Sequence, residues 1–214
     1  MFHTAFIDFD NTLYDTHRMV QDIEHVLADA GVTPSDASET LNLAVHGASG
    51  SFFDYTFELH ARLLRDRGYD LPHDTLVSTL NALIAQSYQY DDAEAFLQFL
   101  KPICHQVVLL TAGNDAFQRQ KLSGTNLSPY FDTVMVLHEK KDDYVRGVAN
   151  PAGKHLFVND NLRENVTVHA TCPNVVVVTK RHPVKYSEQE LKASEIPYFN
   201  SLTDIISYLI SQTL

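Results

Sequence analysis

The chain has 214 residues, of which 44% are apolar, and a formal net charge of −11 at pH 7. That length and apolar content support one full hydrophobic core with a smaller appended unit, and they exclude a disordered or fibrous protein. The negative charge and the 16 Lys and Arg residues argue against nucleic acid or an anionic membrane surface as the main partner, because phosphate backbones recruit clustered cations. A small anion bound together with a metal ion is compatible with this charge.

The only two cysteines, Cys104 and Cys172, lie far apart in the sequence, each in or beside an apolar segment. We therefore expect two buried thiols in the core rather than a disulfide framework, which fits a reducing compartment. The N-terminal apolar stretch is interrupted at Asp8, and no window approaches the ~20 apolar residues of a spanning helix. The expected location is the cytoplasm.

Short apolar runs, β-branched or aromatic and without alternation, predict strands of a parallel sheet that is covered on both faces. These runs are residues 5–9, 107–110, 134–137, 156–158 and 175–178. Segments with helical signals lie between them, such as residues 114–122 and residues 201–210. Alternating strands and helices predict an α/β fold with a doubly wound, mainly parallel, Rossmann-like sheet.

Residues 16–90 break this alternation, because they contain no convincing strand. Apolar residues at helical spacing instead predict three helices, marked by Val20, Ile23, Leu27 and Ala30, then by Phe53, Phe57 and Leu64, and then by Leu76, Leu80, Leu83 and Ile84 after Asp74. An insert of this length between the first two strands favours a separate small domain over a single helical layer. We predict a core of residues 1–15 and 91–214, with an all-helical cap domain of residues 16–90 inserted after the first strand.

Acidic and hydroxyl residues come directly after some of the predicted strands. Asp8 and Asp10 follow the first strand, Thr111 and Gly113 follow the second, and Asp160 follows the fourth. Each feature alone is more often a solvated turn or cap. Open α/β sheets bind their ligands at the carboxyl ends of the strands, so the joint occurrence of all three predicts a chemical site there.

These motifs resemble those of the haloacid dehalogenase (HAD) superfamily of phosphohydrolases. The first family motif, an apolar run followed by D-x-D-x-T, is matched by "FIDFDNTL", and the second, a strand that ends in Thr or Ser, is matched by "VVLLT". The fourth motif, a pair of nearby acids, is matched by Asp160 and Glu164. The resemblance covers nearly the whole chain, and the insert is similar in position to the family's helical C1 cap. The stretch "TAGNDAFQRQKLSGTNLSPYFD" is similar to the nucleotidase-like and general phosphatase branch.

The resemblance implies a phosphomonoester hydrolase that acts through an aspartyl-phosphate on a small phosphorylated metabolite, of the nucleotide or sugar phosphate class. Asp8 would be the nucleophile, and Asp10 the general acid and then the general base. Mg²⁺ would be bound by Asp8, the backbone carbonyl of Asp10 and Asp160, since oxygen ligands suit this hard ion. Glu164 would not bind the metal itself but would orient the residues that do.

The same resemblance implies a set of groups that bind the substrate phosphate. They are the hydroxyl of Thr111, the backbone N–H groups of Ala112 and Gly113, and a lysine of the third motif. The segment "HEKKDDY" offers two lysines, of which we expect Lys140 first and Lys141 next. Lys154 is a third choice, but it immediately precedes a strand.

Asp10 also bears on the reaction class, because family members that cleave carbon–halogen bonds lack a second Asp at this place. Dehalogenation is therefore disfavoured. A phosphomutase stays open, and so does a non-catalytic phosphate-binding regulatory module, whose mark would be the loss of Asp8 or Asp10. The expected partner is a small-molecule phosphate ester, with no nucleic acid and no membrane. The sequence does not indicate an oligomeric state.

Overall fold

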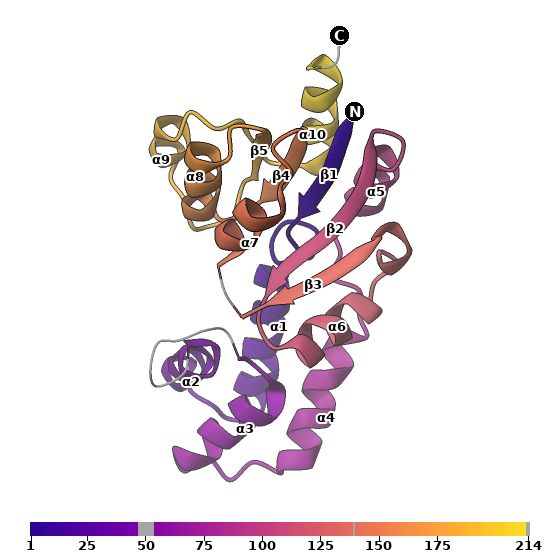
Figure 1. The fold of residues 1–214 in the computed structure, drawn as a ribbon. Coiled ribbons are helices and arrows are strands. Elements are labelled where there is room, and N and C mark those ends of the chain that lie inside the picture. Colours follow the sequence, from indigo (N-terminus) through magenta and orange to yellow (C-terminus); the bar gives the residue numbers. More distant parts are fainter. Residues whose placement is uncertain (47–53, 139, 213–214) are drawn as a thin grey trace.

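The structure is a computed structural model that describes residues 1–46, 54–138 and 140–212. Within these residues, six strands form one sheet in which all neighbours are parallel, in the order β3-β2-β1-β4-β5-β6 (Figure 1). The strands are β1 (Phe2–Ile7), β2 (Cys104–Ala112), β3 (Thr133–Leu137), β4 (His155–Asn159), β5 (Val175–Lys180) and β6 (Tyr198–Phe199). The predicted doubly wound α/β fold is confirmed.

The four inner strands, β1, β2, β4 and β5, are mostly buried on both faces of the sheet, as their continuous apolar runs predicted, and the edge strands β3 and β6 are largely half-buried. Along β1, Ala5 and Ile7 belong to one apolar cluster, and Phe6, which points to the opposite face, belongs to another. The helices that pack on the first face are α5 (Ala93–Leu100) and α10 (Leu202–Ser211), and those on the second are α7 (Lys141–Val148) and α8 (Leu162–Thr171). Both free cysteines are buried, Cys104 in the first cluster and Cys172 in the second.

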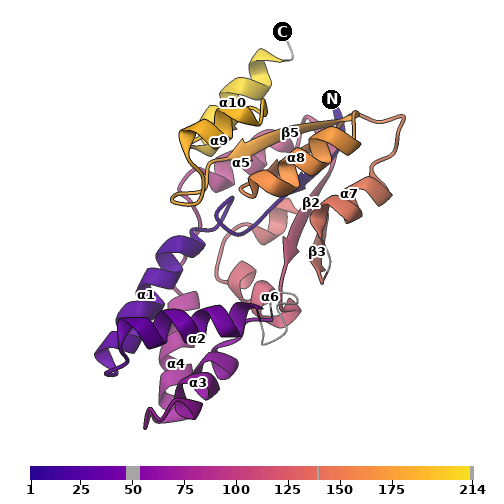
Figure 2. The ribbon, with the colours of Figure 1, turned by 90° about the vertical axis from the view of Figure 1, so that its left-hand side faces the viewer.

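Helices fill the described part of the insert, beyond the carboxyl ends of β1 and β2 (Figures 1 and 2). They are α1 (Thr16–Asp29), α2 (Pro34–His46), α3 (Phe57–Asp66) and α4 (His73–Ile84). The division into a core of residues 1–15 and 91–214 and a cap of residues 16–90 stays our prediction, and we use "cap" for the helices α1 to α4.

The predicted set of cap helices was incomplete. Helix α2 was not expected, because its buried residues are Ala37, Thr40 and Ala44, which are too small or too polar to make a strong apolar pattern. Helix α3 begins at Phe57, and Phe53, which we had assigned to the same helix, lies outside the described residues.

Two segments join the cap to the core and are hydrogen-bonded to each other. The N–H of Asp15 donates to the carbonyl of Tyr88 at 2.7 Å, and the N–H of Tyr90 donates to the carbonyl of Leu13 at 3.0 Å. This pairing fixes where α1 begins relative to the sheet, and therefore which side of α1 faces the carboxyl ends of the strands.

The remaining helices are α6 (Asp115–Ser123) and α9 (Glu188–Ala193), with a 3₁₀ turn at Ser128–Tyr130. Helix α6 begins one residue later than predicted because Asn114 is its N-cap, whose side chain accepts a hydrogen bond from the N–H of Phe117 at 3.0 Å. Ser201 caps α10 in the same way. Among the described helices, none combines the length and the apolar character that crossing a bilayer requires.

The interior of the cap contains a buried histidine with hydrogen bonds on both ring nitrogens. Nδ1 of His60 lies 3.0 Å from the hydroxyl of Tyr55, and Nε2 lies 3.0 Å from the hydroxyl of Thr40. Burial lowers the pKa of His60 to about 4, because the apolar surroundings disfavour the charged ring. The ring is therefore neutral at neutral pH.

We expect His60 to make the stability of the protein depend on pH. Between pH 6.5 and about 4, the unfolded chain binds a proton on this histidine and the folded chain does not, so stability falls as the pH drops. The contribution is up to about 3 kcal/mol of unfolding free energy. Denaturant titrations across this pH window should give a shallower pH dependence for His60→Gln. His25→Gln, at an exposed position of α1, should keep the wild-type slope, and identical slopes for all three proteins would contradict the assignment.

Candidate active site

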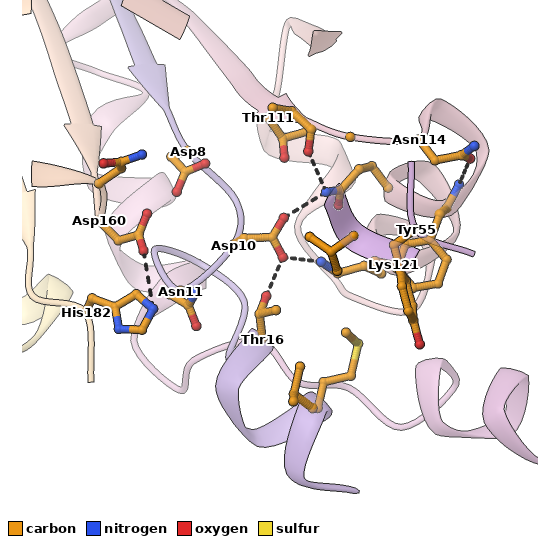
Figure 3. Close-up of a pocket in the computed structure, with 18 of the residues that line it drawn as sticks. Asp8, Asp10, Asn11, Thr16, Tyr55, Thr111, Asn114, Lys121, Asp160 and His182 are labelled. Atoms are coloured by element: carbon orange, nitrogen blue, oxygen red, sulfur yellow. Dashed lines mark hydrogen bonds and ion pairs between the residues drawn. The ribbon is translucent and has the colours of Figure 1, made fainter. Parts of the chain in front are cut away.

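The sheet topology creates a crevice between β1 and β4. The chain winds outward from this pair in opposite directions, and ligands of open α/β sheets bind at such a switch point. A pocket of about 270 Å³ lies there, between the sheet and the cap (Figure 3). Of the residues expected from the sequence, it is lined by Asp8, Asp10, Thr111, Ala112, Gly113, Lys141, Asp160 and Glu164.

The turn after β1 places both opening acids in the pocket. Asn11 adopts a left-handed backbone conformation with φ of 56°, which asparagine tolerates better than most residues. Its N–H donates to the carbonyl of Tyr14 at 2.7 Å, which closes the turn. The hydroxyl of Thr12 then donates to Oδ2 of Asp8 at 2.7 Å. The threonine of the D-x-D-x-T motif therefore orients the first aspartate.

Asp8 forms a buried ion pair with Lys141, whose Nζ lies 2.6 Å from Oδ1 of Asp8. The same ammonium is 3.4 Å from Oδ1 of Asn159 and 3.6 Å from Oε2 of Glu164. Burial alone would lower the pKa of Lys141, but the charges of Asp8, Glu164 and Asp160 outweigh it and raise that pKa above its ordinary value. Burial raises the pKa of Asp8, and Lys141 opposes this shift.

The structure corrects our choice of lysine. Lys140 is exposed and is the N-cap of α7, whereas Lys141 is the first residue of that helix and is buried. Lys141 and Val145 are four residues apart, so they lie on the same face of α7, and both are buried against the sheet. Helix geometry therefore directs Lys141 to Asp8 and leaves Lys140 in solvent.

Asp160 follows β4 and is buried without a hydrogen-bond donor among the described residues. Burial and the charge of Asp8 raise the pKa of Asp160 well above its ordinary value. Nε2 of His182 lies 3.9 Å from Oδ2 of Asp160, but burial lowers the pKa of His182 to about 4, so the ring is neutral near pH 7. Asp160 thus keeps its carboxylate oxygens available for another ligand.

The donor set of the pocket fits Mg²⁺. Within the described residues, no three His, Cys, Asp or Glu side chains are grouped so that they could hold a metal ion by themselves. Mg²⁺ needs only one or two carboxylates and further oxygen ligands, which Asp8, Asp160 and the backbone carbonyl of Asp10 could supply. These acids, together with Glu164, outnumber the buried ammonium groups of the pocket, so a divalent cation would offset repulsion between them.

The carboxyl end of β2 differs from the sequence-based expectation at Gly113, the residue that follows the strand. The hydroxyl of Thr111 lines the pocket, is buried and has no partner among the described residues, so it is available to a phosphate oxygen. The N–H of Gly113 donates to the carbonyl of Leu137 at 3.2 Å, so it is not free to bind phosphate as we expected. This N–H continues the hydrogen bonding between the parallel strands β2 and β3. Gly113 has a φ of 137°, which a glycine adopts easily, and it therefore allows the backbone to turn after β2. The carbonyl of Ala112 accepts from Nε2 of Gln118 at 2.9 Å.

Asp10 is held by a group of donors that the sequence analysis missed. Its carboxylate accepts hydrogen bonds from Lys121 and Thr16, and from Nε2 of Gln118 at 2.8 Å (Figure 3). Burial would raise the pKa of Asp10, but the charge of Lys121 and these hydrogen bonds outweigh it and lower that pKa. In this arrangement Asp10 is a carboxylate.

Lys121 reaches Asp10 through aromatic surroundings. Its Nζ lies 4.6 Å from the ring centroid of Tyr14 and 5.2 Å from that of Phe9, and only 2% of the side chain is exposed. A signal was present in the sequence: Lys121 is four residues after Phe117 and adjacent to Leu122, on the buried face of α6. A cation on the apolar face of a helix indicates a buried partner.

Comparison with known proteins identifies the family. The family described as haloacid dehalogenase-like hydrolase matches residues 2–160, which is most of the chain. The protein belongs to this hydrolase family. No curated protein sequence matches the chain at a significant level.

Solved structures of the HAD superfamily share the fold. A protein of Burkholderia xenovorans LB400 assigned to the haloacid dehalogenase-like hydrolases has 20% identity and a TM-score of 0.72, with 100% of both chains covered. L-2-haloacid dehalogenase from Xanthobacter autotrophicus has 17% identity and a TM-score of 0.64, with 98% of both chains covered. A Thermotoga maritima protein proposed to be a beta-phosphoglucomutase has 13% identity and a TM-score of 0.68, covering 98% of this chain and 99% of that one. At these identities the likeness shows the fold alone.

We expect the ion pair between Lys121 and Asp10 to stabilise this HAD hydrolase. Lys121→Met fills the aromatic surroundings but removes the partner of Asp10, and losing one partner of a buried pair destabilises by about 3–5 kcal/mol. Denaturant unfolding should show this loss, and the double variant Lys121→Met/Asp10→Asn should recover much of it. Lys192→Met, which breaks an exposed ion pair with Glu188, should change stability by less than about 1 kcal/mol. Equal effects of the two lysine variants would contradict the buried pairing.

Proposed function

We propose that this protein is a Mg²⁺-dependent phosphomonoester hydrolase that acts through an aspartyl-phosphate at Asp8 on a small phosphate ester. The observation that carries the proposal is one pocket containing an oriented carboxylate, Asp8, and a second acid, Asp10, two residues away. The likeness of residues 111–132 to the nucleotidase-like and general phosphatase branch also supports it.

Asp8 has the contacts that a nucleophile needs. Thr12 and Lys141 fix its two oxygens, and Lys141 offsets part of the repulsion between this carboxylate and a phosphate dianion. Attack by a carboxylate oxygen on phosphorus forms the Asp8–phosphate bond and breaks the bond to the leaving alcohol. Hydrolysis of this acyl phosphate by water then releases inorganic phosphate and restores Asp8.

Asp10 is suited to the proton transfers of these two steps. In the first step Asp10 carries a proton and gives it to the oxygen of the leaving alcohol, and in the second step the resulting carboxylate takes a proton from the attacking water, which restores the acid. As the carboxylate held by Lys121, Thr16 and Gln118, Asp10 is in the state that accepts the proton of water. A halide leaves without a proton, so this residue favours phosphate esters over haloacids as substrates.

The transferring phosphate would meet the unpaired hydroxyl of Thr111 and the ammonium of Lys141. A Mg²⁺ ion bound by Asp8, Asp160 and the carbonyl of Asp10 would neutralise charge that develops on the phosphate oxygens. Glu164 accepts from the Asn159 side chain at 2.9 Å and stands 3.6 Å from Lys141, so it positions that lysine.

We expect the purified protein to release inorganic phosphate from at least one small monoester in Mg²⁺, using a panel of monoesters that includes p-nitrophenyl phosphate, with acetyl phosphate, an acyl phosphate, tested beside it. Turnover should disappear in EDTA and return when Mg²⁺ is added in excess. No chloride should be released from 2-chloropropionate.

Asp8→Asn is the control for this assay and should abolish phosphate release, because the covalent bond forms at that carboxylate. Undiminished turnover in EDTA, full activity of Asp8→Asn, or chloride release without phosphate release would each contradict the proposed function.

A second measurement tests the lysine assignment. Lys141→Ala removes the ammonium beside the nucleophile and the phosphate, and should lower kcat/KM by about 10²–10³, the range for one lost electrostatic contact in a site of this kind. Lys140→Ala changes a solvent-exposed neighbour and should alter kcat/KM by less than about threefold. Circular dichroism checks that both variants fold. A silent Lys141→Ala beside a damaged Lys140→Ala would reverse the assignment.

A further inference from the structure

The cap forms the wall of the pocket that faces the leaving group. Thr16, at the start of α1, is bonded to Asp10 at the base of this wall. The other described cap residues that line the pocket come from α1, α2 and the segment before α3: Met19, Val20, Ile23, Leu41, Val45 and Tyr55. All of these present apolar or aromatic surface. Phe117 of α6 continues the same surface on the core side.

The polar atom that Tyr55 could contribute is engaged inside the cap. Its hydroxyl lies 3.0 Å from Nδ1 of His60, and the other ring nitrogen of His60 lies 3.0 Å from the hydroxyl of Thr40. Tyr55 therefore offers its ring to the pocket. Figure 3 shows Tyr55 on the side of the pocket opposite Asp8 and Asp160.

The cap wall also lacks charge among the described residues. Among the described residues, the lysines that line the pocket all come from the core. Lys121 is paired with Asp10, and Lys141 is paired with Asp8. The charge of Lys185 lowers the pKa of Asp160. A second phosphate or a carboxylate on the leaving group would find no opposite charge on this wall.

We propose, building on the phosphatase function above, that the leaving group of the substrate is a compact apolar alcohol and not a polyol or a nucleoside. The pocket, about 270 Å³, is at the small end of ligand sites, and the phosphate must share it with the leaving group. Sugar hydroxyls or base edges that are buried against Met19, Ile23 and Leu41 would lose water without gaining a partner. An apolar group gains by the same burial.

The test compares two esters of primary alcohols that each carry a six-membered ring. We expect kcat/KM for cyclohexylmethyl phosphate to exceed that for glucose 6-phosphate by about tenfold or more, since an apolar wall discriminates against added hydroxyls on this scale or above. A ratio of one or below overturns the inference. Acetyl phosphate, which has no alcohol group, separates the two proposals. Phosphate release from it together with a preference for glucose 6-phosphate refutes only the substrate class, and no release from any ester refutes the proposed function.

Matched variants locate the discrimination in the cap wall. Leu41→Asn places an amide in the pocket and should lower the ratio at least about fivefold, whereas Leu43→Asn, on the exposed side of the same helix, should leave the ratio within about twofold. Val45→Thr, which adds a hydroxyl with almost no change of shape, should lower the ratio in the same direction and keeps the test valid if Leu41→Asn does not fold. An unchanged ratio in both pocket variants refutes the role of the wall.

Discussion

Carboxylates crowd the carboxyl ends of β1 and β4, and most of the surrounding structure acts to hold them there against their mutual repulsion. Asp8, Asp10, Asp160 and Glu164 line one pocket, and burial strengthens the repulsion because little water screens it. The raised pKa of Asp160 is a direct consequence of this crowding. The arrangement is stable only with positive charge nearby, from the chain itself and, as we propose, from Mg²⁺.

Two buried ammonium groups offset this charge in different ways. Lys141 stands between Asp8 and Glu164 and faces the position where a phosphate would bind. Lys121, from α6 of the core, contacts Asp10 and lies beside the rings of Tyr14 and Phe9. The two opening acids are therefore in unlike environments, although they are two residues apart. Asp8 is beside Lys141, the lysine that we propose to bind the phosphate, and Asp10 is fixed by Lys121, which lines the same pocket.

The fold could be predicted largely from local pattern. Continuous apolar runs indicated the five long strands, and these runs ended at polar residues that the structure gathers at one edge of the sheet. Strand β6 was not expected, because its two residues carry too little pattern to separate it from a loop. Helix α2 was not expected because it buries small side chains. Both elements depend on contacts with distant parts of the chain, and the local sequence pattern carries no information about those contacts.

The sequence by itself determined which acids lie at the strand ends, because Asp8, Asp10 and Asp160 each come after a continuous apolar run, and that pattern is local. It did not determine the cations. Lys140 and Lys141 are adjacent and chemically alike, and only the orientation of α7 against the sheet decides which of them reaches Asp8. The contact between Lys141 and Asp8 is set by packing between two elements that are far apart in the chain. The apolar wall of the pocket likewise exists only once the cap helices pack over the sheet.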